Sequence, residues 1–250
     1  MLANKEISAT AITLKYYDIG ESDKIYALFS REYGIIRAVA KGIKKPKSKF
    51  SGRLDLLNVN ELVIREGRNL GTIVECESYK VFPLLRLDYD KLIYSLFLGE
   101  LILLFSNEGE SFEQVFDLLI STLEAIQKAD IPLIYIIWFE IQFLSLLGYQ
   151  SNFSECDICK QKVAEKNNRL GYSLSTGSII CEHCLKITYN YKIIDDSIKN
   201  ILNNLKYIDI NSLSEFNAEA KNLNKIQDVL KEYLSSLSER KIKTLSVFDN

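Results

Sequence analysis

The 250-residue sequence predicts an α+β protein with an N-terminal five-stranded OB-fold barrel, a central and C-terminal helical domain, and a four-cysteine zinc element inserted into that helical domain. Three observations predict this class. Residues 6–80 hold five short strand-like runs separated by turns. From Asp88 onward the apolar side chains recur with helical spacing. Two C-x-x-C pairs follow. The predicted domains are 1–82 (barrel), 83–150 with 189–250 (helical) and 151–188 (zinc module).

The barrel prediction begins with a strand in which Ile12, Leu14 and Tyr16 alternate with less apolar residues, the period of a half-buried strand. Turns are predicted at 19–23 and 32–34, where Gly34 is free to adopt a positive φ. Further strands are predicted at 24–30, 35–40, 54–64 and 70–79. Five short strands in so little chain favour a small Greek-key barrel, a common nucleic-acid-binding fold.

The helical pattern predicts helices at 88–107, 112–126 and 132–147, and then at 198–205 and 223–237. Pro132 suits the first position of its helix, and Gly148 suits the residue just past the end. Residues 195–197 have the composition of a helix N-cap. The last segment, Lys241 to Phe248, is predicted to be extended.

The two C-x-x-C pairs, Cys156 with Cys159 and Cys181 with Cys184, predict one tetrahedral zinc site. The 21 residues between the pairs slightly exceed the usual gap of about 15–20. Four thiolates would close the coordination sphere, so the predicted zinc is structural. His183 lies between two ligands and is expected to face solvent.

Other interpretations of the cysteines remain open at this point: an empty site, an iron–sulfur cluster, a redox pair or disulfides. Disulfides need an oxidising compartment, and the first ten residues lack the apolar run of a signal peptide. The fifth cysteine, Cys76, lies in a predicted strand and is expected to be a small buried residue.

Charge is distributed unevenly. The whole chain has a net charge of −2, yet residues 1–80 hold 14 Lys and Arg against 10 Asp and Glu. The segment from Lys41 to Arg53 contains no acid, and Gly, Ser and Pro predict a loop there. Such a local excess indicates a polyanion-binding face. The predicted nucleic-acid-binding residues are Arg37, Lys41, Lys44, Lys45, Lys47, Lys49 and Arg53.

Aromatic residues near this loop could stack nucleobases, and the candidates are Tyr16, Tyr17, Tyr33 and Phe50. The alternatives are that the lysines form only a solvated surface and that the aromatic residues belong to the core. We find no nucleophile elbow, Walker A loop, dinucleotide-binding loop or zinc-deaminase pattern, so we expect no enzyme. The alternatives to DNA binding are a zinc-ribbon adaptor that binds only proteins and an enzyme of unfamiliar type. No run of about 18 uncharged apolar residues predicts a membrane span.

Several segments resemble the bacterial RecO family of recombination mediators and DNA repair proteins. They are Tyr17 with IGESDKI at 19–25, FSREYGIIR at 29–37, VAKGIKKPKS at 39–48, LLGY at 146–149 and KIKTL at 241–245. The resemblance covers almost the whole chain. Gly20 departs from the family pattern, which has a bulkier residue there.

The resemblance implies an N-terminal OB-fold, a helical domain and an inserted zinc element. It implies binding of single- and double-stranded DNA and annealing of complementary strands. It also implies loading of RecA, together with RecR, onto strands coated by single-stranded-DNA-binding protein. A cytoplasmic, nucleoid-associated location follows from the same resemblance.

Overall fold

The computed structural model describes residues 5–68, 70–163 and 169–249. Residues 1–4 and 69 of the predicted barrel, 164–168 of the predicted zinc module and 250 of the predicted helical domain lie outside the described residues. The chain divides into two compact units, Met1–Gln127 and Lys128–Asn250. This division groups the first two long helices with the barrel. The three-domain boundaries predicted from the sequence stay a prediction.

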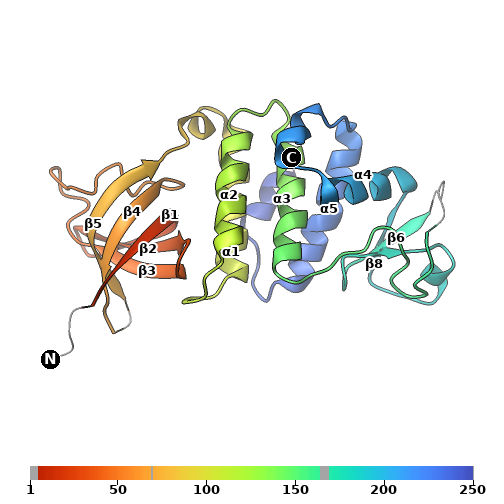
Figure 1. Cartoon of the computed structure of the whole chain (residues 1–250), viewed down its shortest axis with the longest axis horizontal. Helices are drawn as coiled ribbons and strands as arrows, with labels where there is room; N and C mark the ends of the chain where they lie inside the picture. Colours follow the sequence, from red (N-terminus) through yellow and green to blue (C-terminus); the bar gives the residue numbers. More distant parts are fainter. Residues whose placement is uncertain (1–4, 69, 164–168, 250) are drawn as a thin grey trace. The chain divides into compact units, whose positions relative to one another are not determined.

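The first unit contains a closed five-stranded barrel, as the sequence predicted (Figure 1). The strand order is β1-β2-β3-β5-β4, with β3 and β5 parallel and every other pair antiparallel. β1 is long enough to pair with β4 through its first half and with β2 through its second half, with an irregularity between Thr13 and Lys15. The strands are β1 (Glu6–Ile19), β2 (Asp23–Ser30), β3 (Gly34–Ala40), β4 (Val59–Arg65) and β5 (Gly71–Lys80).

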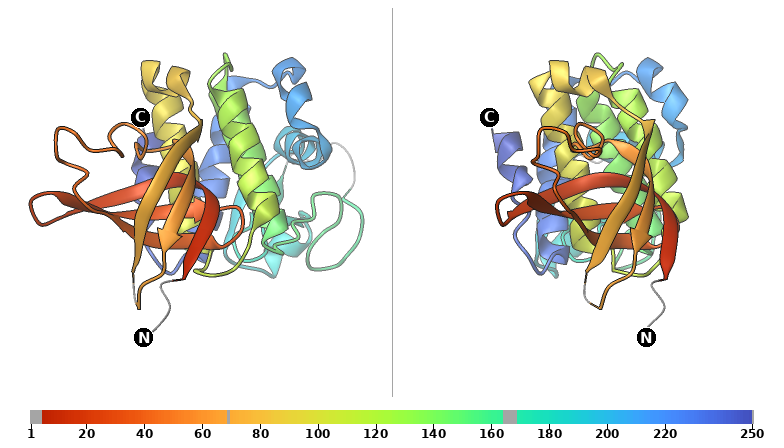
Figure 2. Two further views of the ribbon diagram at one scale, coloured as in Figure 1. Left: turned by 60° about the vertical axis from the view of Figure 1, so that its left-hand side comes forward. Right: turned by 90° about the vertical axis from the view of Figure 1, so that its left-hand side faces the viewer.

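Two helices, α1 (Tyr89–Phe105) and α2 (Glu113–Ile126), pack on the barrel within the same unit, after a short 3₁₀ turn, η1 (Pro83–Leu87) (Figure 2). Leu14 of β1 lies against Gly99 of α1, and the Phe29 and Phe116 rings are 5.9 Å apart. Both faces of the middle of β1 are therefore covered. This explains why residues 11–14 are all buried although the sequence predicted a half-buried, alternating strand.

The fourth strand was predicted to begin too early. Residues 54–58 are not strand, and β4 begins at Val59. The reason is the long turn-rich loop of residues 41–58, which places Phe50 and Leu54 in the same buried cluster as Leu62 of β4. The short apolar run in this loop has the sequence pattern of a buried strand because its side chains fill the core of the barrel, although its backbone is not a strand.

Gly34 is the first residue of β3, directly after the turn at 31–33, and has the positive φ, +64°, that the sequence predicted. A Cβ atom there would lie 2.0 Å from the backbone oxygen of Glu110, in the connection between α1 and α2. Glycine is required here both by the left-handed backbone and by this close approach. The turn is thereby held against the helices of its own unit.

The second unit combines three helices with a small three-stranded sheet of order β7-β6-β8. Pro132 opens α3, and Gly148 ends it with a φ of +89°, after which the Tyr149 N–H donates to the Leu144 carbonyl. The Asp195 side chain caps α4 by accepting from the Ile198 N–H. The elements are α3 (Pro132–Leu146), β6 (Leu170–Ser173), β7 (Ile179–Ile180), η2 (Cys184–Lys186), β8 (Tyr191–Ile194), α4 (Asp196–Tyr207), η3 (Ile210–Glu215), α5 (Ala220–Leu237) and η4 (Thr244–Asp249).

The C-terminal segment corrects one prediction. It was expected to be extended, but Thr244–Asp249 forms the 3₁₀ turn η4. Ile242 and Leu245 are both buried, and they are three residues apart. A continuous strand would place these two side chains on opposite faces, whereas here the chain enters the turn η4 at Thr244 and both are buried.

A buried carboxyl group lies in the core of the second unit. Glu140 of α3 is fully buried and accepts a hydrogen bond from the Gln227 amide of α5, at 3.1 Å. Tyr172 of β6 and Tyr233 of α5 lie close by, with ring centroids 5.8 Å apart. Burial raises the pKa of Glu140 to about 8, although the Gln227 hydrogen bond lowers it. The carboxyl group is therefore largely protonated at neutral pH.

Among the helices in the described ranges, none combines the length and apolar character that crossing a membrane requires.

Candidate nucleic-acid interface and metal centre

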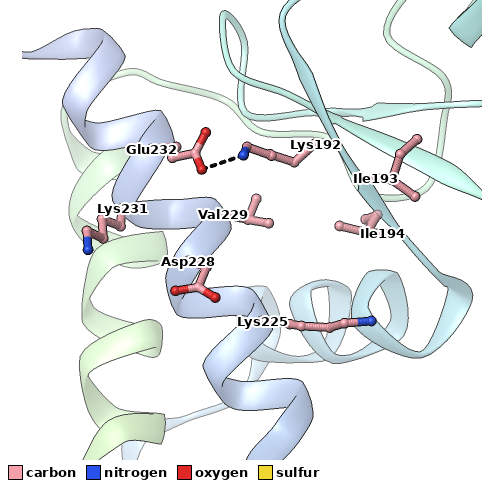
Figure 3. Close-up of a pocket in the computed structure, with 8 residues that line it drawn as sticks. All are labelled: Lys192, Ile193, Ile194, Lys225, Asp228, Val229, Lys231 and Glu232. Atoms are coloured by element: carbon pink, nitrogen blue, oxygen red, sulfur yellow. Dashed lines mark ion pairs between the residues drawn. The ribbon is translucent and has the colours of Figure 1, made fainter. Parts of the chain in front are cut away.

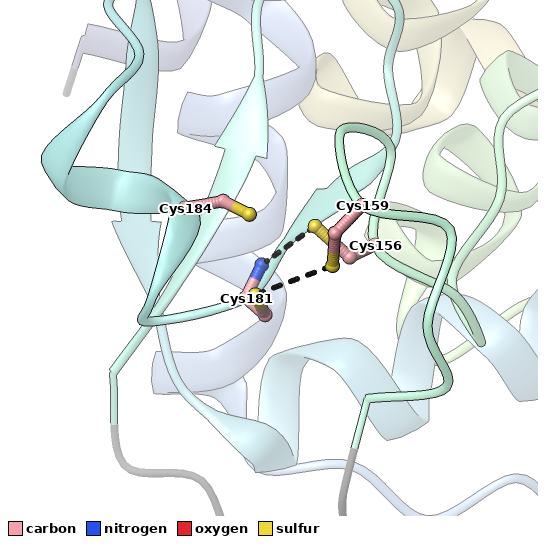
Figure 4. A group of neighbouring side chains, drawn as sticks. All are labelled: Cys156, Cys159, Cys181 and Cys184. Atoms are coloured by element: carbon pink, nitrogen blue, oxygen red, sulfur yellow. Dashed lines mark hydrogen bonds between the residues drawn. The ribbon is translucent and has the colours of Figure 1, made fainter.

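The four predicted ligands come together at one point of the second unit (Figure 4). The sulfur atoms of Cys156, Cys159, Cys181 and Cys184 all lie within 4.8 Å of one another. The Cys159 and Cys181 sulfurs are 3.9 Å apart, and all four thiols are free. Ligands bound to zinc at about 2.3 Å with tetrahedral geometry would be about 3.8 Å apart. The cluster therefore has the dimensions of a zinc site and not of a disulfide.

Local backbone turns create this arrangement. In the first turn the Lys160 N–H donates to the Cys156 carbonyl, and Lys160 has a φ of +57°. In the second turn the Cys184 N–H donates to the Cys181 carbonyl as η2 begins. The Cys181 N–H in turn donates to the Cys156 sulfur at 3.3 Å, which joins the two turns across the cluster.

The electrostatics of the cluster favour a cation. Burial alone would raise the pKa of Cys156, but backbone N–H groups of Cys181, Cys159 and Ile158 donate to its sulfur and lower the pKa to about 7. Burial, and then the three neighbouring sulfurs, raise the pKa of Cys184 to about 12. Four crowded sulfurs of this kind are the donor set of zinc, whose charge would stabilise them as thiolates. The residues present therefore fit a zinc ion.

The packing around the cluster agrees with a structural centre. Cys156 and Cys184 belong to a small buried cluster with Ile180 and Leu185. Gly171 of β6 lies beneath it, and a Cβ atom there would be 2.5 Å from Leu185. His183 is exposed, as predicted, and is not part of the group. Cys76 is buried in the barrel core, also as predicted.

Four of the seven predicted DNA-binding residues already have a partner on the protein. Arg37 forms an ion pair with Glu108 at 2.7 Å, and Lys44 forms one with Asp18 at 3.1 Å. The other two bind the backbone of β5. Lys49 donates to the Val74 carbonyl and Arg53 to the Cys76 carbonyl, each at 2.6 Å. The contacts of Lys44, Lys49 and Arg53 hold the 41–58 loop against the barrel. Counting charges along the sequence does not reveal this role.

The remaining three, Lys41, Lys45 and Lys47, are exposed, and their side chains have no hydrogen bond or ion pair with any residue in the described ranges. The loop that carries them is held at its start by Asp23, whose side chain accepts from the Gly42 N–H at 2.7 Å. That hydrogen bond, more than any other contact, lowers the pKa of Asp23. The loop thus presents three exposed ammonium groups from an anchored backbone, and two of them, Lys41 and Lys45, lie near enough to Asp23 to lower its pKa further.

This difference between anchored and free cations is testable. Arg53→Ala should lower the free energy of unfolding by about 1 kcal/mol, because it removes a charge-assisted hydrogen bond to the Cys76 carbonyl. Lys47→Ala should change it by less than about 0.5 kcal/mol, because the side chain is exposed. Urea denaturation of both variants measures the contrast, and equal effects would show that the Arg53 contact is not structural.

The candidate aromatic residues also fall into two groups, one buried and one exposed. Phe50 is 4% exposed and belongs to the barrel core, so for this candidate the alternative of a core residue holds. Tyr16, Tyr17 and Tyr33 are each at least partly exposed. The sequence could not separate these cases because burial depends on contacts with residues that are distant in the chain, such as those of Phe50 with Leu62 and Ile73.

A separate groove of about 320 Å³ lies between β8 and α5 (Figure 3). Its walls carry Lys192, Lys225 and Lys231 together with Asp228 and Glu232. Lys192 and Glu232 form an ion pair at 2.6 Å across it. Because cations and acids are mixed here, the groove lacks the unbalanced positive charge of the 41–58 loop.

Comparisons with known proteins agree with this arrangement. A family model described as recombination protein O, N terminal, matches residues 3–82, and one described as recombination protein O, C terminal, matches residues 86–246. A protein of Pelotomaculum thermopropionicum named DNA repair protein RecO is 31% identical over 245 residues, which is 98% of this chain and 94% of that protein. A protein of the same name from Desulforamulus reducens is 28% identical over 241 residues, 96% of this chain and 92% of that protein.

A third protein of that name, from Desulfitobacterium hafniense, is 32% identical over 176 residues, 70% of this chain and 63% of that protein. The barrel falls within the first family match, and the four-cysteine cluster falls within the second. Since the two matches together cover almost the whole chain, this chain belongs to the recombination protein O (RecO) family.

Proposed function

We propose that this protein binds DNA through its barrel and acts as a recombination mediator in DNA repair. The observation that carries the proposal is the acid-free loop at 41–53, which presents Lys41, Lys45 and Lys47 from an OB-fold barrel. OB-folds commonly bind oligonucleotides. Membership of the RecO family and the printed names of the relatives support the repair role.

The chemistry of lysine defines the expected mode of binding. A flexible ammonium group acts as a point charge toward phosphate and does not make the bidentate contacts that distinguish bases. Binding through these lysines is therefore independent of sequence and open to both single and double strands. Lys44, Lys49 and Arg53 complete the proposed interface by fixing the loop, and Arg37 of β3 adds a cation beside it.

The proposed role of the metal is to hold the zinc module together. Zinc bound by Cys156, Cys159, Cys181 and Cys184 would have four protein ligands and no open position for a substrate or water. A bound zinc ion would cross-link the two chain segments that carry the C-x-x-C pairs. We therefore propose binding, and not catalysis, as the activity of this chain.

The mediator steps are proposed from family membership. They are annealing of complementary strands and, with RecR, loading of RecA onto DNA coated by single-stranded-DNA-binding protein, in the cytoplasm at the nucleoid. The direct test of the annealing step is the rate at which two complementary labelled oligonucleotides pair with and without the protein. An unchanged rate would contradict this part of the proposal.

The three free lysines give the sharpest test of DNA binding itself. Replacing Lys41, Lys45 and Lys47 together by Ala should weaken binding similarly for unrelated sequences, because only phosphate contacts are lost. Each neutralised phosphate on a single strand contributes about −0.7 to the slope of log K against log salt concentration. The slope should therefore become shallower by at most about 2. Fluorescence anisotropy over a series of salt concentrations measures both quantities.

The matched control replaces Lys186, Lys221 and Lys241 by Ala. These three are exposed, without a side-chain partner among the residues described, and their loss changes the net charge equally. The control should bind DNA as the unchanged protein does. If both triple variants behave alike, the loop is a solvated surface. Complete absence of DNA binding by the intact chain would instead favour the alternative, a zinc-ribbon adaptor that binds proteins.

A further inference from the structure

Tyr17 occupies a different position from the other aromatic residues of the barrel. It pairs with Ile25 of β2, which pairs in turn with Val39 of β3. Tyr26 and Ala38, the neighbours of Ile25 and Val39 in the sequence, belong to the barrel core. Because successive side chains of a strand point to opposite faces, the row Tyr17–Ile25–Val39 lies on the outer face of the barrel.

The surroundings of Tyr17 suit a nucleotide. Tyr17 is 52% exposed, and its direct neighbour in the row, Ile25 of β2, is a partly buried aliphatic residue. The next row on the same face begins with Lys15 and ends with Arg37. The Lys15 ammonium is 4.9 Å from the centre of the Tyr17 ring. The exposed ring offers a π-face to a base, and the Lys15 ammonium over the ring offers a counter-charge to its phosphate.

The other candidate rings share only some of these properties. Like Tyr17, Tyr16 has a lysine ammonium over its ring, here that of Lys24 at 3.8 Å from the centre. Tyr16 also has the Tyr26 ring 5.8 Å away and is less exposed than Tyr17, at 40%. Phe50 is buried. Tyr33 lies in the turn between β2 and β3, where Gly34 packs against the loop between α1 and α2. Of the four candidates from the sequence, Tyr17 is the most exposed.

We propose that Tyr17 is a stacking platform for an unpaired nucleobase and that it gives the barrel a preference for single-stranded over double-stranded DNA. The proposal rests on the DNA-binding function proposed above and names the strand type that this site selects. In a duplex the faces of the bases are occupied by their neighbours in the stack. Only an unpaired strand offers a base face to the ring, whereas both strand types offer phosphates to the lysines.

The test compares the intact protein with Tyr17→Leu and Tyr17→Phe on an oligothymidylate, a duplex of the same length and an abasic oligonucleotide. Loss of one stacked base should weaken binding of Tyr17→Leu to the oligothymidylate about 5- to 100-fold. Duplex affinity should change less than about twofold, because phosphate contacts remain. Tyr17→Phe should bind like the unchanged protein, since the ring is kept. Tyr79→Leu, which removes another exposed barrel tyrosine, is the control and should have no effect.

The abasic oligonucleotide tests the idea without relying on a variant. The unchanged protein should bind it more weakly than the oligothymidylate, and Tyr17→Leu should bind both alike. Unchanged affinity of Tyr17→Leu for the oligothymidylate, or no preference of the unchanged protein for bases over abasic sites, would overturn the inference. In either case DNA binding through the lysines would stand. Failure of the unchanged protein to bind any of the three would instead remove the proposed function.

Discussion

Cys159→Ser should abolish zinc binding and unfold the zinc module while leaving the barrel folded. Zinc bound by four thiolates contributes about 10–16 kcal/mol of apparent binding free energy in small modules, and one serine hydroxyl replaces a thiolate poorly. The effect should stay local because the barrel has its own buried core in the other unit. Elemental analysis should find one zinc per chain before the substitution and none after it. Hydrogen exchange should then accelerate in the described residues between 151 and 188.

Cys76→Ala is the matched control, because Cys76 is the one cysteine that lies outside the cluster. This variant should retain one zinc per chain, with any change in stability confined to the barrel. A purified, unsubstituted chain that contains no zinc, iron or other metal would contradict the proposed centre. Restoration of a hydrolytic activity by zinc would contradict its purely structural role.

Glu140→Gln should stabilise the protein at neutral and higher pH and have little effect near pH 4.5. Burial raises the pKa of Glu140 from an ordinary 4.5 to about 8. Below about pH 4.5 both the folded and the unfolded states hold the proton, so the group imposes no penalty. Between about pH 4.5 and pH 8 the unfolded state releases the proton and the folded state keeps it, so stability falls as pH rises. The loss amounts to about 5 kcal/mol across this window and levels off above it.

Urea denaturation at pH 5, 6.5 and 8 measures this effect. The free energy of unfolding of the Gln variant minus that of the unchanged protein should be near zero at pH 5 and reach several kcal/mol at pH 8. The neighbouring phenols do not interfere, because burial raises the pKa of Tyr233 to about 12 and that of Tyr172 well above its ordinary value. Glu232→Gln, at a partly exposed site, should leave the pH dependence unchanged. Parallel pH profiles for the unchanged protein and Glu140→Gln would show that the carboxyl ionises freely.

Local signals in the sequence were sufficient for most of the elements. Pro132 and Gly148 mark the ends of α3, and Asp195 marks the start of α4, because caps and end residues act within one turn of chain. Gly34 could be predicted as a left-handed turn for the same reason. The C-x-x-C pairs indicated a common site because their spacing is itself a geometric constraint.

What the sequence could not show depends on long-range packing. The apolar residues before Val59 were predicted to be strand, yet Leu54 reaches the barrel core from a loop. The basic segment appeared uniform along the chain, but Lys44 and Arg53 bind groups that are 26 and 23 residues away in sequence, respectively. The burial of Glu140 could not be predicted from the neighbouring sequence, because its hydrogen-bond partner Gln227 is 87 residues away. Long-range pairings of this kind become visible only in the folded chain.

Amide hydrogen exchange of the intact chain, with and without a saturating oligothymidylate, tests the central claim that DNA lies on the barrel. The proposed interface predicts slower exchange in residues 15–26 and 37–49 when DNA is present. Residues 128–249 should exchange at nearly the same rate in both samples. Slower exchange confined to the second unit would contradict the claim and place the DNA on the helices or the zinc module. No slowing anywhere, under conditions where anisotropy detects no binding, would contradict DNA binding altogether.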